Sequence, residues 1–534
     1  MSHKLYLKSN VIAEPLWNQW YAWSFLIQPI TAAYINEHHL RVLESYLEAP
    51  DLHAIASKKS ALRGGAFLEN NSDIAAIQDL IDRTKTRLSK HRELVQAIKK
   101  LDRLLQQEAT GYSLESFYDQ VDDILKGYIE IVYDLNDNPK IRFIEPLFYY
   151  SEFYDETLQS ISLSESSADG RAFVLSSPRL VSDHSLHLSI PFRSTAWDEL
   201  FAMRSQGVTE VQLDQWLDSA ANTLSSSQRL LFKRFFTTLP PEQKADREYK
   251  GEGIRVRYFG HATMLLQTKN VSIMTDPIVS YPLEGDTNRY TFNDLPEKID
   301  YVVLTHNHQD HVMFETLLQL RHKIETIVVP RSSGGDLQDP SLRLTLNAIG
   351  FENVIELAEL QTINSGSSCI TGLPFLGEHG DLDVRSKLAF CVQLYDKRFL
   401  FAADSNNLED KLYERLRRIV GNIDYLFIGM ECAGAPMSWL YGPLYTKLIS
   451  HKNNQSRRLN GSGFEHAFNI VNHFSPQGAY IYAMGAEPWL TFISSISYED
   501  DSGPIIESNQ FVAACRSKGI DSRRLYGSDE MELL

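Results

Sequence analysis

The spacing of apolar residues changes character about halfway along the chain. In the stretch 73–108, apolar residues recur at steps of three, four, six and seven positions, which predicts one long amphipathic helix. Ser72 or Asp73 is placed to cap its N-terminus, and Gly111 follows its end. Strand-like runs are predicted at 127–133 and 141–150, and two or three helical stretches at 195–236. The first half is therefore expected to mix helices and strands.

A polar segment at 238–253 has Pro and Gly near its ends. Beyond it, the spacing of apolar residues changes to the two-residue alternation of strands. The run 254–259 alternates as a strand, and two further runs flank Lys269-Asn270 as a hairpin. After this, predicted strands at 301–305, 326–330, 388–394, 399–403, 425–430 and 479–483 are interspersed with helices at 312–323 and 342–349. This order predicts an α/β architecture with helix-covered sheets and ligands at strand ends. We expect two domains, 1–245 and 246–534.

The loop after the predicted strand 301–305 concentrates metal-binding side chains. It reads Thr-His-Asn-His-Gln-Asp-His over 305–311. Four such ligands this close together cannot all reach one ion. We therefore expect His306 and His308 at one metal and Asp310 and His311 at a second, roughly 3.5–4 Å away. Only 16 histidines occur in the 534 residues, so three within six positions argue against an ordinary solvated loop.

Composition narrows the class of protein. The net charge of −17 argues against nucleic acid as a partner, although basic patches at Arg229, Lys233 and Arg234 or at Arg457-Arg458 could dock a partner. No apolar run is long enough to span a bilayer, and the first residues do not form a secretory signal. Four widely spaced cysteines are typical of reduced thiols, so a cytoplasmic location is expected. Three tryptophans in 17–23 are expected in the core, with exposure at an oligomer interface as the alternative.

The order of three motifs resembles the metallo-β-lactamase superfamily. Gly260-His261-Ala262-Thr263 follows the first strand of the second half, Thr275-Asp276-Pro277 follows the hairpin, and the histidine-rich loop comes next. The resemblance covers roughly 251–489 and implies an αββα sandwich with two metals at one edge. It also places Asp404, which ends the strand 399–403, as the carboxylate that bridges both ions.

Two positions depart from the usual superfamily pattern. Where a third histidine is usual, the chain reads Gly-Glu-His-Gly over 377–380, so Glu378 and His379 compete as ligands. Where a last histidine is usual, the strand 479–483 and the residues after it contain none. His466 is the nearest substitute, and His473, on the same predicted helix, is a poorer one. Glu431 is a further carboxylate at a strand end.

With Glu378 as a ligand, the set resembles the diiron amino-acid β-hydroxylases of nonribosomal peptide biosynthesis. Glu14-Pro15-Leu16, the tryptophan cluster and Gly64-Gly65-Ala66-Phe67 are similar to that family's N-terminal domain, which extends the resemblance over nearly the whole chain. The resemblance implies that His306, His308 and Glu378 hold one iron. Asp310, His311 and, as our choice, His466 would hold the other, with Asp404 bridging. Glu378 and Asp404 would also serve as the catalytic residues.

This resemblance implies a monooxygenase that hydroxylates Cβ of an amino acid held as a thioester on a carrier domain. Its cofactors would be two iron ions, bridged by an oxo or hydroxo group when oxidised, with O₂ as co-substrate and an external electron donor. Its partners would be the loaded carrier domain and an electron-transfer protein, and we further expect a homodimer. The N-terminal domain would serve dimerisation or carrier docking. The alternatives are a dizinc hydrolase of the same fold, favoured if His379 is the ligand, and a degenerate, non-enzymatic binding protein.

Overall fold

The second half of the chain contains two seven-stranded sheets, the first of which carries the histidine-rich loop. In the computed structural model, residues 4–24, 28–59, 62, 65–69, 73–242, 246–366 and 368–534 are described. Gly64 and Ser72, named above in a motif and as a cap, lie outside these residues. The order of the first sheet is β14 (Val354–Leu357), β13 (Ile324–Pro330), β12 (Ile299–Val303), β11 (Ser272–Thr275), β10 (Thr263–Gln267), β9 (Ile254–Gly260) and β24 (Asp529–Leu533). Strands β11 to β14 are parallel, whereas β9, β10 and β24 pair antiparallel.

The second sheet packs face to face against the first. Its order is β15 (Thr362–Ser365), β16 (Ser368–Leu373), β17 (Ala389–Leu394), β18 (Lys397–Phe401), β19 (Tyr425–Gly429), β22 (Gly478–Tyr482) and β23 (Asp521–Arg524). One buried cluster joins the two inner faces, for example Val256 and Val303 with Phe390 and Phe427. Large apolar side chains on facing strands account for this packing, because their burial is what holds two sheets together.

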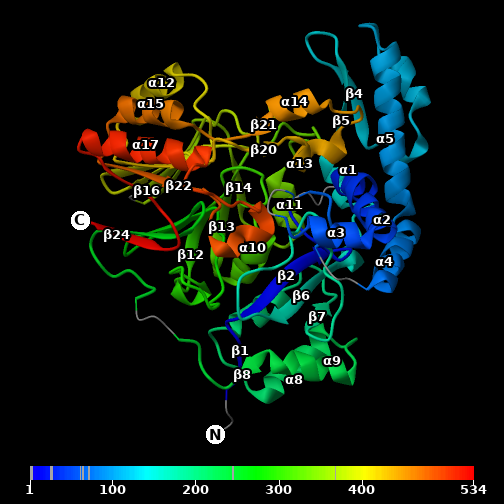
Figure 1. Ribbon diagram of the computed structural model, residues 1–534, viewed down its shortest axis with the longest axis horizontal. Coiled ribbons are helices and arrows are strands. Elements are labelled where there is room, and N and C mark those ends of the chain that lie inside the picture. The colour runs from blue at the N-terminus through cyan, green and yellow to red at the C-terminus, as the bar shows by residue number, and fades with distance from the viewer. Residues whose placement is uncertain are drawn as a thin grey trace.

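Helices cover both outer faces of this pair of sheets (Figure 1). Helices α12 (Lys411–Val420), α15 (Phe464–Phe474) and α17 (Gly503–Ser517) lie on the second sheet, where Ile470, Val471 and Phe511 pack against Leu400 and Leu426. Helices α10 (Phe314–Leu320) and α11 (Leu342–Ala348) lie on the outer side of the first sheet. The arrangement is the expected αββα sandwich, and the predicted hairpin is formed by β10 and β11.

The first half of the chain folds around a four-stranded antiparallel sheet. Its order is β3 (Trp20–Tyr21), β2 (Val11–Trp17), β6 (Gln159–Glu165) and β7 (Ser185–Leu188). Its helices include α1 (Gln28–Tyr34), α2 (Leu40–Glu48), α3 (Pro50–Ala56), α7 (Ala196–Ala202), α8 (Glu210–Ala220) and α9 (Ser226–Arg234). The last three confirm the helical prediction for 195–236. Trp17 and Trp20 are buried in the core as expected, whereas Trp23 is only partly buried. No helix among the described residues is long and apolar enough to cross a membrane.

The prediction of one helix over 73–108 is wrong, because the chain breaks at Leu88. Helix α4 (Ile74–Arg87) and helix α5 (Ser89–Glu108) meet at this residue, whose ψ of 27° is not helical. The buried face of α4 packs into one core, whereas that of α5 packs into another. The two helices therefore need different directions. At the start of α4, Asp73 accepts a hydrogen bond from the Ala75 N–H, which confirms it as a cap.

The run 141–150 is also not a single strand. After β4 (Ile129–Tyr133) the chain turns and returns as β5 (Pro139–Phe143), and the remaining residues form the short helix α6 (Glu145–Tyr149). Pro146 stands at the start of this helix, where a missing N–H costs nothing. The apolar run therefore serves two elements, which periodicity alone does not separate.

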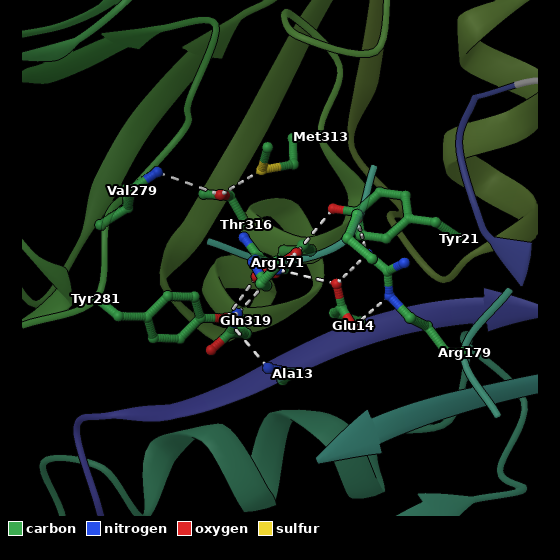
Figure 2. A network of polar contacts seen from close by, with 12 residues as sticks. Ala13, Glu14, Tyr21, Arg171, Arg179, Val279, Tyr281, Met313, Thr316 and Gln319 are labelled. Atoms are coloured by element: carbon green, nitrogen blue, oxygen red, sulfur yellow. Dashed lines mark hydrogen bonds and ion pairs between the residues drawn. The ribbon is translucent and has the colours of Figure 1, made fainter. Parts of the chain in front are cut away.

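The two halves share one hydrophobic core and a buried polar network (Figure 2). Glu315, on α10, accepts hydrogen bonds from Arg171 at 2.8 Å, from the Tyr21 hydroxyl at 2.8 Å and from the Tyr281 hydroxyl at 2.7 Å. Glu14, on β2, accepts hydrogen bonds from Arg171 and Arg179. Because α10 follows the histidine-rich loop directly, this network ties that loop to the N-terminal half.

Candidate metal centre

The side chains predicted as ligands converge at one edge of the sandwich. The loop bearing His306, His308, Asp310 and His311 follows β12, and Asp404 follows β18. Glu378 lies in the loop after β16, and His261 follows β9. Strand ends of two packed sheets meet at this edge, so residues far apart in the sequence become neighbours.

The first potential metal-binding group is His306, His308 and Glu378, all of them buried. The Glu378 carboxylate lies 2.7 Å from His308 Nδ1 and 3.7 Å from His306 Nε2. The backbone at Gly377 packs closely against Asn406. A Cβ on Gly377 would lie only 2.6 Å from the Asn406 Cβ. Gly377 therefore permits the tight turn that presents Glu378 to the two imidazoles.

The second group is His261, Asp310 and His311. His261 Nε2 lies 3.4 Å from Asp310 Oδ2. On its other side, His311 is held by Asp276, whose carboxylate lies 2.8 Å from His311 Nδ1. This contact fixes the ring so that His311 Nε2 points toward Asp404 and the other donors, as carboxylate partners of metal-binding histidines commonly do.

Asp404 joins the two groups. Together with His306 from the first group and His311 from the second, it forms a third potential metal-binding set. One carboxylate oxygen lies 3.1 Å from His311 Nε2, and the other has no hydrogen-bond partner although it is buried. A carboxylate between two sets of imidazoles is suited to bridge two cations.

Two sequence candidates stand apart from these groups among the described residues. His466 is only half-buried, and its Nδ1 lies 2.6 Å from the Asn406 side-chain oxygen. His261 takes the place in the second group that we assigned to His466 from the sequence. His379 lies beside the first group and contacts Glu378 at 2.9 Å, but it belongs to none of the three sets.

The residues fit two iron ions on chemical grounds. Both ring nitrogens of His261, together with Nε2 of His306, are buried without hydrogen-bond partners. Such unpaired polar atoms are costly unless a ligand satisfies them. The combined set offers four imidazoles and three carboxylates and contains no thiolate. Imidazole and carboxylate ligands suit iron, and the three negative charges offset those of two cations.

Electrostatics favour the metal-binding forms of His306 and Glu378. Burial and four neighbouring imidazoles hold the pKa of His306 well below its ordinary value, so its ring is neutral. Burial alone would raise the pKa of Glu378, but the charges and hydrogen bonds of His308 and His379 outweigh it and lower the pKa to about 2. Glu378 is therefore ionised at neutral pH. Neutral imidazole and ionised carboxylate are the states that bind metal.

A cavity of about 480 Å³ opens onto this centre. Its metal-facing side is lined by His261, His308, Asp310, Glu378 and Asp404, and Glu431 also reaches it. Burial, with a smaller contribution from Asp404, raises the pKa of Glu431 to about 7. The opposite wall is largely apolar and includes Phe67 from the N-terminal half and Trp439 from the C-terminal half. Both halves of the chain therefore contribute to the space in which a substrate would lie.

Sequence reasoning did not assign His261 or Asp276 a role beyond marking the superfamily. Their positions carried a usable signal: each directly follows a predicted strand, and the chain lacks the usual last histidine. An imidazole at another strand end was therefore a natural replacement. The role of Asp276 could not be read locally, because its partner His311 is 35 residues away.

Fold and site together define a metallo-β-lactamase-fold protein with a two-metal centre, and comparison with known proteins specifies the family. The family model for the "Diiron non-heme beta-hydroxylase N-terminal domain" matches residues 6–240, and that for the "Beta-lactamase superfamily domain" matches 272–437. The 4-amino-L-phenylalanyl-[CmlP-peptidyl-carrier-protein] 3-hydroxylase of Streptomyces venezuelae is 36% identical over 97% of this chain and 98% of its own length. The crystal structure of CmlA, a diiron β-hydroxylase from the same organism, matches with a TM-score of 0.93 at 34% identity and covers 100% of both chains. A glutamate-to-aspartate variant of CmlA matches with a TM-score of 0.91 at 34% identity, over 99% of this chain and 100% of its own.

The chain belongs to the diiron non-haem β-hydroxylase family. Its relatedness extends over both halves, which confirms the resemblance inferred from the N-terminal motifs as well as that from the histidine-rich loop. It is an oxygen-dependent hydroxylase whose cofactors are two iron ions. The dizinc hydrolase and the non-enzymatic binding protein are therefore set aside as alternatives.

Proposed function

We propose that this enzyme β-hydroxylates an amino acid carried as a thioester on the phosphopantetheine arm of a nonribosomal peptide synthetase carrier domain. O₂ supplies two oxygen atoms. One enters the Cβ–H bond as a hydroxyl group, and the other leaves as water after two electrons and two protons are taken up. The observation that carries the proposal is the match over 97% of this chain to an enzyme whose name gives a 4-amino-L-phenylalanyl carrier protein as its substrate.

The buried donor set supports specific roles for the residues. His306, His308 and Glu378 would hold one iron, and His261, Asp310 and His311 the other, with Asp404 in contact with both. When bound, the iron pair supplies the O₂-derived oxidant that removes hydrogen from Cβ. As expected from the sequence, we propose Glu378 and Asp404 as the catalytic residues.

The surrounding residues hold the donors in position and keep water out. Asp276 fixes the orientation of His311, and the Tyr441 hydroxyl lies 3.4 Å from His308 Nε2. Burial of His306, His308 and His311 limits water near the reacting atoms, which protects a reactive oxidant from side reactions. The apolar wall with Phe67 and Trp439 offers contact area that would orient the amino acid with Cβ toward the donors.

The cellular location of the enzyme follows from that of its partner, the nonribosomal peptide synthetase. Nonribosomal peptide synthesis and reduced thiols are both cytoplasmic features, and the four cysteines of this chain are free. We therefore propose a cytoplasmic location, an external electron-transfer protein as reductant, and a homodimer.

The decisive experiment combines metal analysis with substrate comparison. Aerobically purified protein should contain about two irons per chain, and after reduction it should consume O₂ and add one oxygen atom to an aminoacyl carrier domain. The free amino acid should be turned over far more slowly, because the carrier contributes binding energy that positions Cβ. Equal turnover of the free and tethered amino acids would contradict carrier presentation. Two tightly held zinc ions and no O₂ consumption would contradict the assignment as a whole.

A further inference from the structure

The residues 432–464 form a segment whose charge is opposite to that of the whole chain. About one residue in eight of the protein is acidic, yet this segment contains no Asp or Glu and four basic residues, Lys447, Lys452, Arg457 and Arg458. His451 adds a fifth nitrogen base. In a protein with a net charge of −17, a stretch of this length without a carboxylate is a marked local exception. We call residues 432–464 the basic segment.

The basic segment forms one wall of the cavity above the metal centre. It comprises β20 (Ala435–Pro436), α13 (Ser438–Tyr441), α14 (His451–Ser456) and β21 (Arg458–Leu459). Pro436, Trp439, Leu440 and Leu459 line the cavity, and Arg457 Nε donates to the Gly380 carbonyl at 2.7 Å. Because Gly380 is only two residues past Glu378, the segment lies directly over the ligand loop. Figure 1 shows α14 at the upper surface, between α15 and α5.

The lysine side chains of the basic segment have no counter-charge among the described residues, whereas Arg458 interacts electrostatically with Glu431. Lys447 contacts only the Gln106 amide oxygen, at 3.4 Å, and Arg458 donates to the Ala433 carbonyl and the Gln455 amide oxygen. None of its four Lys and Arg side chains forms an ion pair with a described carboxylate. The neighbouring Leu448 is fully exposed, so an apolar side chain stands among the positive charges. Exposed cations around an apolar contact point are suited to bind an acidic protein surface.

The basic patch that we first considered from the sequence differs in this respect. Arg229 pairs with Asp218 at 2.6 Å, and Lys233 pairs with Asp214 at 2.7 Å. Both cations therefore already have partners on the neighbouring helix α8. Neither residue lines the cavity at the metal centre, whereas the basic segment does. Arg234, the third cation of that patch, is exposed and forms no ion pair with a described carboxylate, but it does not line this cavity either. Position, together with charge at two of the three residues, therefore favours the basic segment over α9.

We propose that the exposed face of the basic segment, with Lys447, Leu448 and Lys452 at its centre, is the surface on which the carrier domain docks. The inference rests on the proposed function, since a carrier domain is the partner that function requires. Carrier domains are generally acidic, so their charge complements this face. A carrier seated there would hold the origin of its arm near the cavity wall that other residues of the same segment form, among them Pro436, Trp439 and Leu459.

Charge reversal with a matched control tests this surface. The variant Lys447→Glu/Lys452→Glu should raise KM for the loaded carrier domain about tenfold at low ionic strength, with kcat at saturation unchanged. The control Lys250→Glu/Arg415→Glu removes the same charge from two exposed positions outside the basic segment and should leave KM within about twofold of the wild type. Added salt should weaken carrier binding by the wild type and the control, but not by the Lys447/Lys452 variant.

A second substrate separates docking from the reaction itself. An aminoacyl-loaded carrier domain of a nonribosomal peptide synthetase is compared with the same aminoacyl group on free pantetheine. The Lys447/Lys452 variant should process the pantetheine thioester as the wild type does, because that substrate has an arm but no acidic domain. Equal KM values for the loaded carrier in both double variants would overturn the docking proposal. So would a change in oligomeric state of the Lys447/Lys452 variant with its carrier kinetics unaltered, which would assign this face to a second copy of the chain. A wild-type enzyme that hydroxylates neither substrate would instead overturn the proposed function.

Discussion

Residues around the metal centre have unusual backbone conformations. His261, Asp276 and Glu378 have φ angles of 50°, 35° and 68°, and Ala403 and Ala483, next to the site, have φ angles of 47° and 52°. Residues other than glycine rarely adopt this left-handed backbone conformation. Each one that does so costs about 1–3 kcal/mol. Such strain persists only where surrounding contacts enforce it. Its concentration here indicates that the donor geometry is set by the fold before metal binds.

The choice between Glu378 and His379 as a ligand is testable by paired substitutions. Glu378→Ala should lower iron content or abolish O₂ consumption, because it removes the ionised donor that faces His306 and His308. Glu378→Asp should keep the metal but react slowly, since its carboxylate is withdrawn by about one C–C bond. His379→Ala should leave iron content and hydroxylation largely intact. Loss of iron in His379→Ala together with full iron content in Glu378→Ala would reverse the assignment.

The second iron offers an equally direct comparison between two histidines. His261→Ala should lower iron content from about two to about one per chain, because this variant removes a buried imidazole whose ring nitrogens form no hydrogen bond. His466→Ala should retain both irons, since its ring contacts Asn406 and lies outside the three metal-binding sets. Metal analysis of the purified variants measures both outcomes. Iron loss on substituting His466, with His261→Ala unchanged, would restore the choice made from the sequence.

At the scale of elements, helix α10 connects the metal-bearing loop to the N-terminal half. Its Glu315 is buried and accepts hydrogen bonds from Arg171, Tyr21 and Tyr281. Glu315→Ala should lower the free energy of unfolding by about 3–5 kcal/mol, because it leaves a buried guanidinium short of its main counter-charge. Denaturant unfolding measures this loss.

Two further variants serve as comparisons for Glu315→Ala. Glu315→Gln keeps a hydrogen-bond acceptor of the same shape and should fall between the wild type and Glu315→Ala. Glu352→Ala, at an exposed glutamate, should change stability by less than about 0.5 kcal/mol. A stability of Glu315→Ala close to that of Glu352→Ala would show that the network contributes little to holding the two halves together.

The elements also show how far the sequence could be interpreted. Nine of the fourteen described strands of the sandwich and the histidine-rich loop were predicted, because period, turn residues and ligand spacing are local properties. Strands β14, β15, β16, β23 and β24 were not predicted. The break at Leu88 was not predicted either, because it arises from two cores that lie in different directions. The Glu14–Arg171–Glu315 network was also missed, because its members come from distant parts of the chain. His261, in contrast, carried a usable signal at a strand end that was not used. Arg171 and Glu315 are 144 residues apart, and only the tertiary fold makes them neighbours.

For the whole molecule, a buried carboxyl group at the junction of the halves makes stability depend on pH. Glu145, on α6, is buried and accepts a hydrogen bond from the Ser341 N–H at the start of α11. Burial, together with the charges of Asp339 and Glu356, raises its pKa from 4.5 to about 7. The folded state therefore binds this proton more tightly than the unfolded state does. The resulting stabilisation is fully present below pH 4.5 and is lost as the pH rises through 7.

Glu145→Gln should remove this dependence. Above pH 7.5 the variant should be more stable than the wild type by up to about 3 kcal/mol, and the difference should shrink toward pH 5. Urea unfolding at several pH values measures both slopes. Glu359→Gln, at an exposed carboxyl group, provides the control and should follow the wild type. Parallel stability curves for the wild type and Glu145→Gln would contradict the raised pKa.

The contact between Ser24 and Asn307 has a consequence for the evolution of the two halves of the chain. Asn307 stands between two of the candidate ligands, and its side chain is hydrogen-bonded to a serine from the N-terminal half, whose carbonyl in turn accepts from Thr345. Recombination that paired this catalytic half with a foreign N-terminal half would break contacts at the metal loop itself. The two halves are therefore expected to have diverged together and to resist exchange as separate modules. Chimeras between family members should lose iron even when the junction falls in the linker and both halves fold.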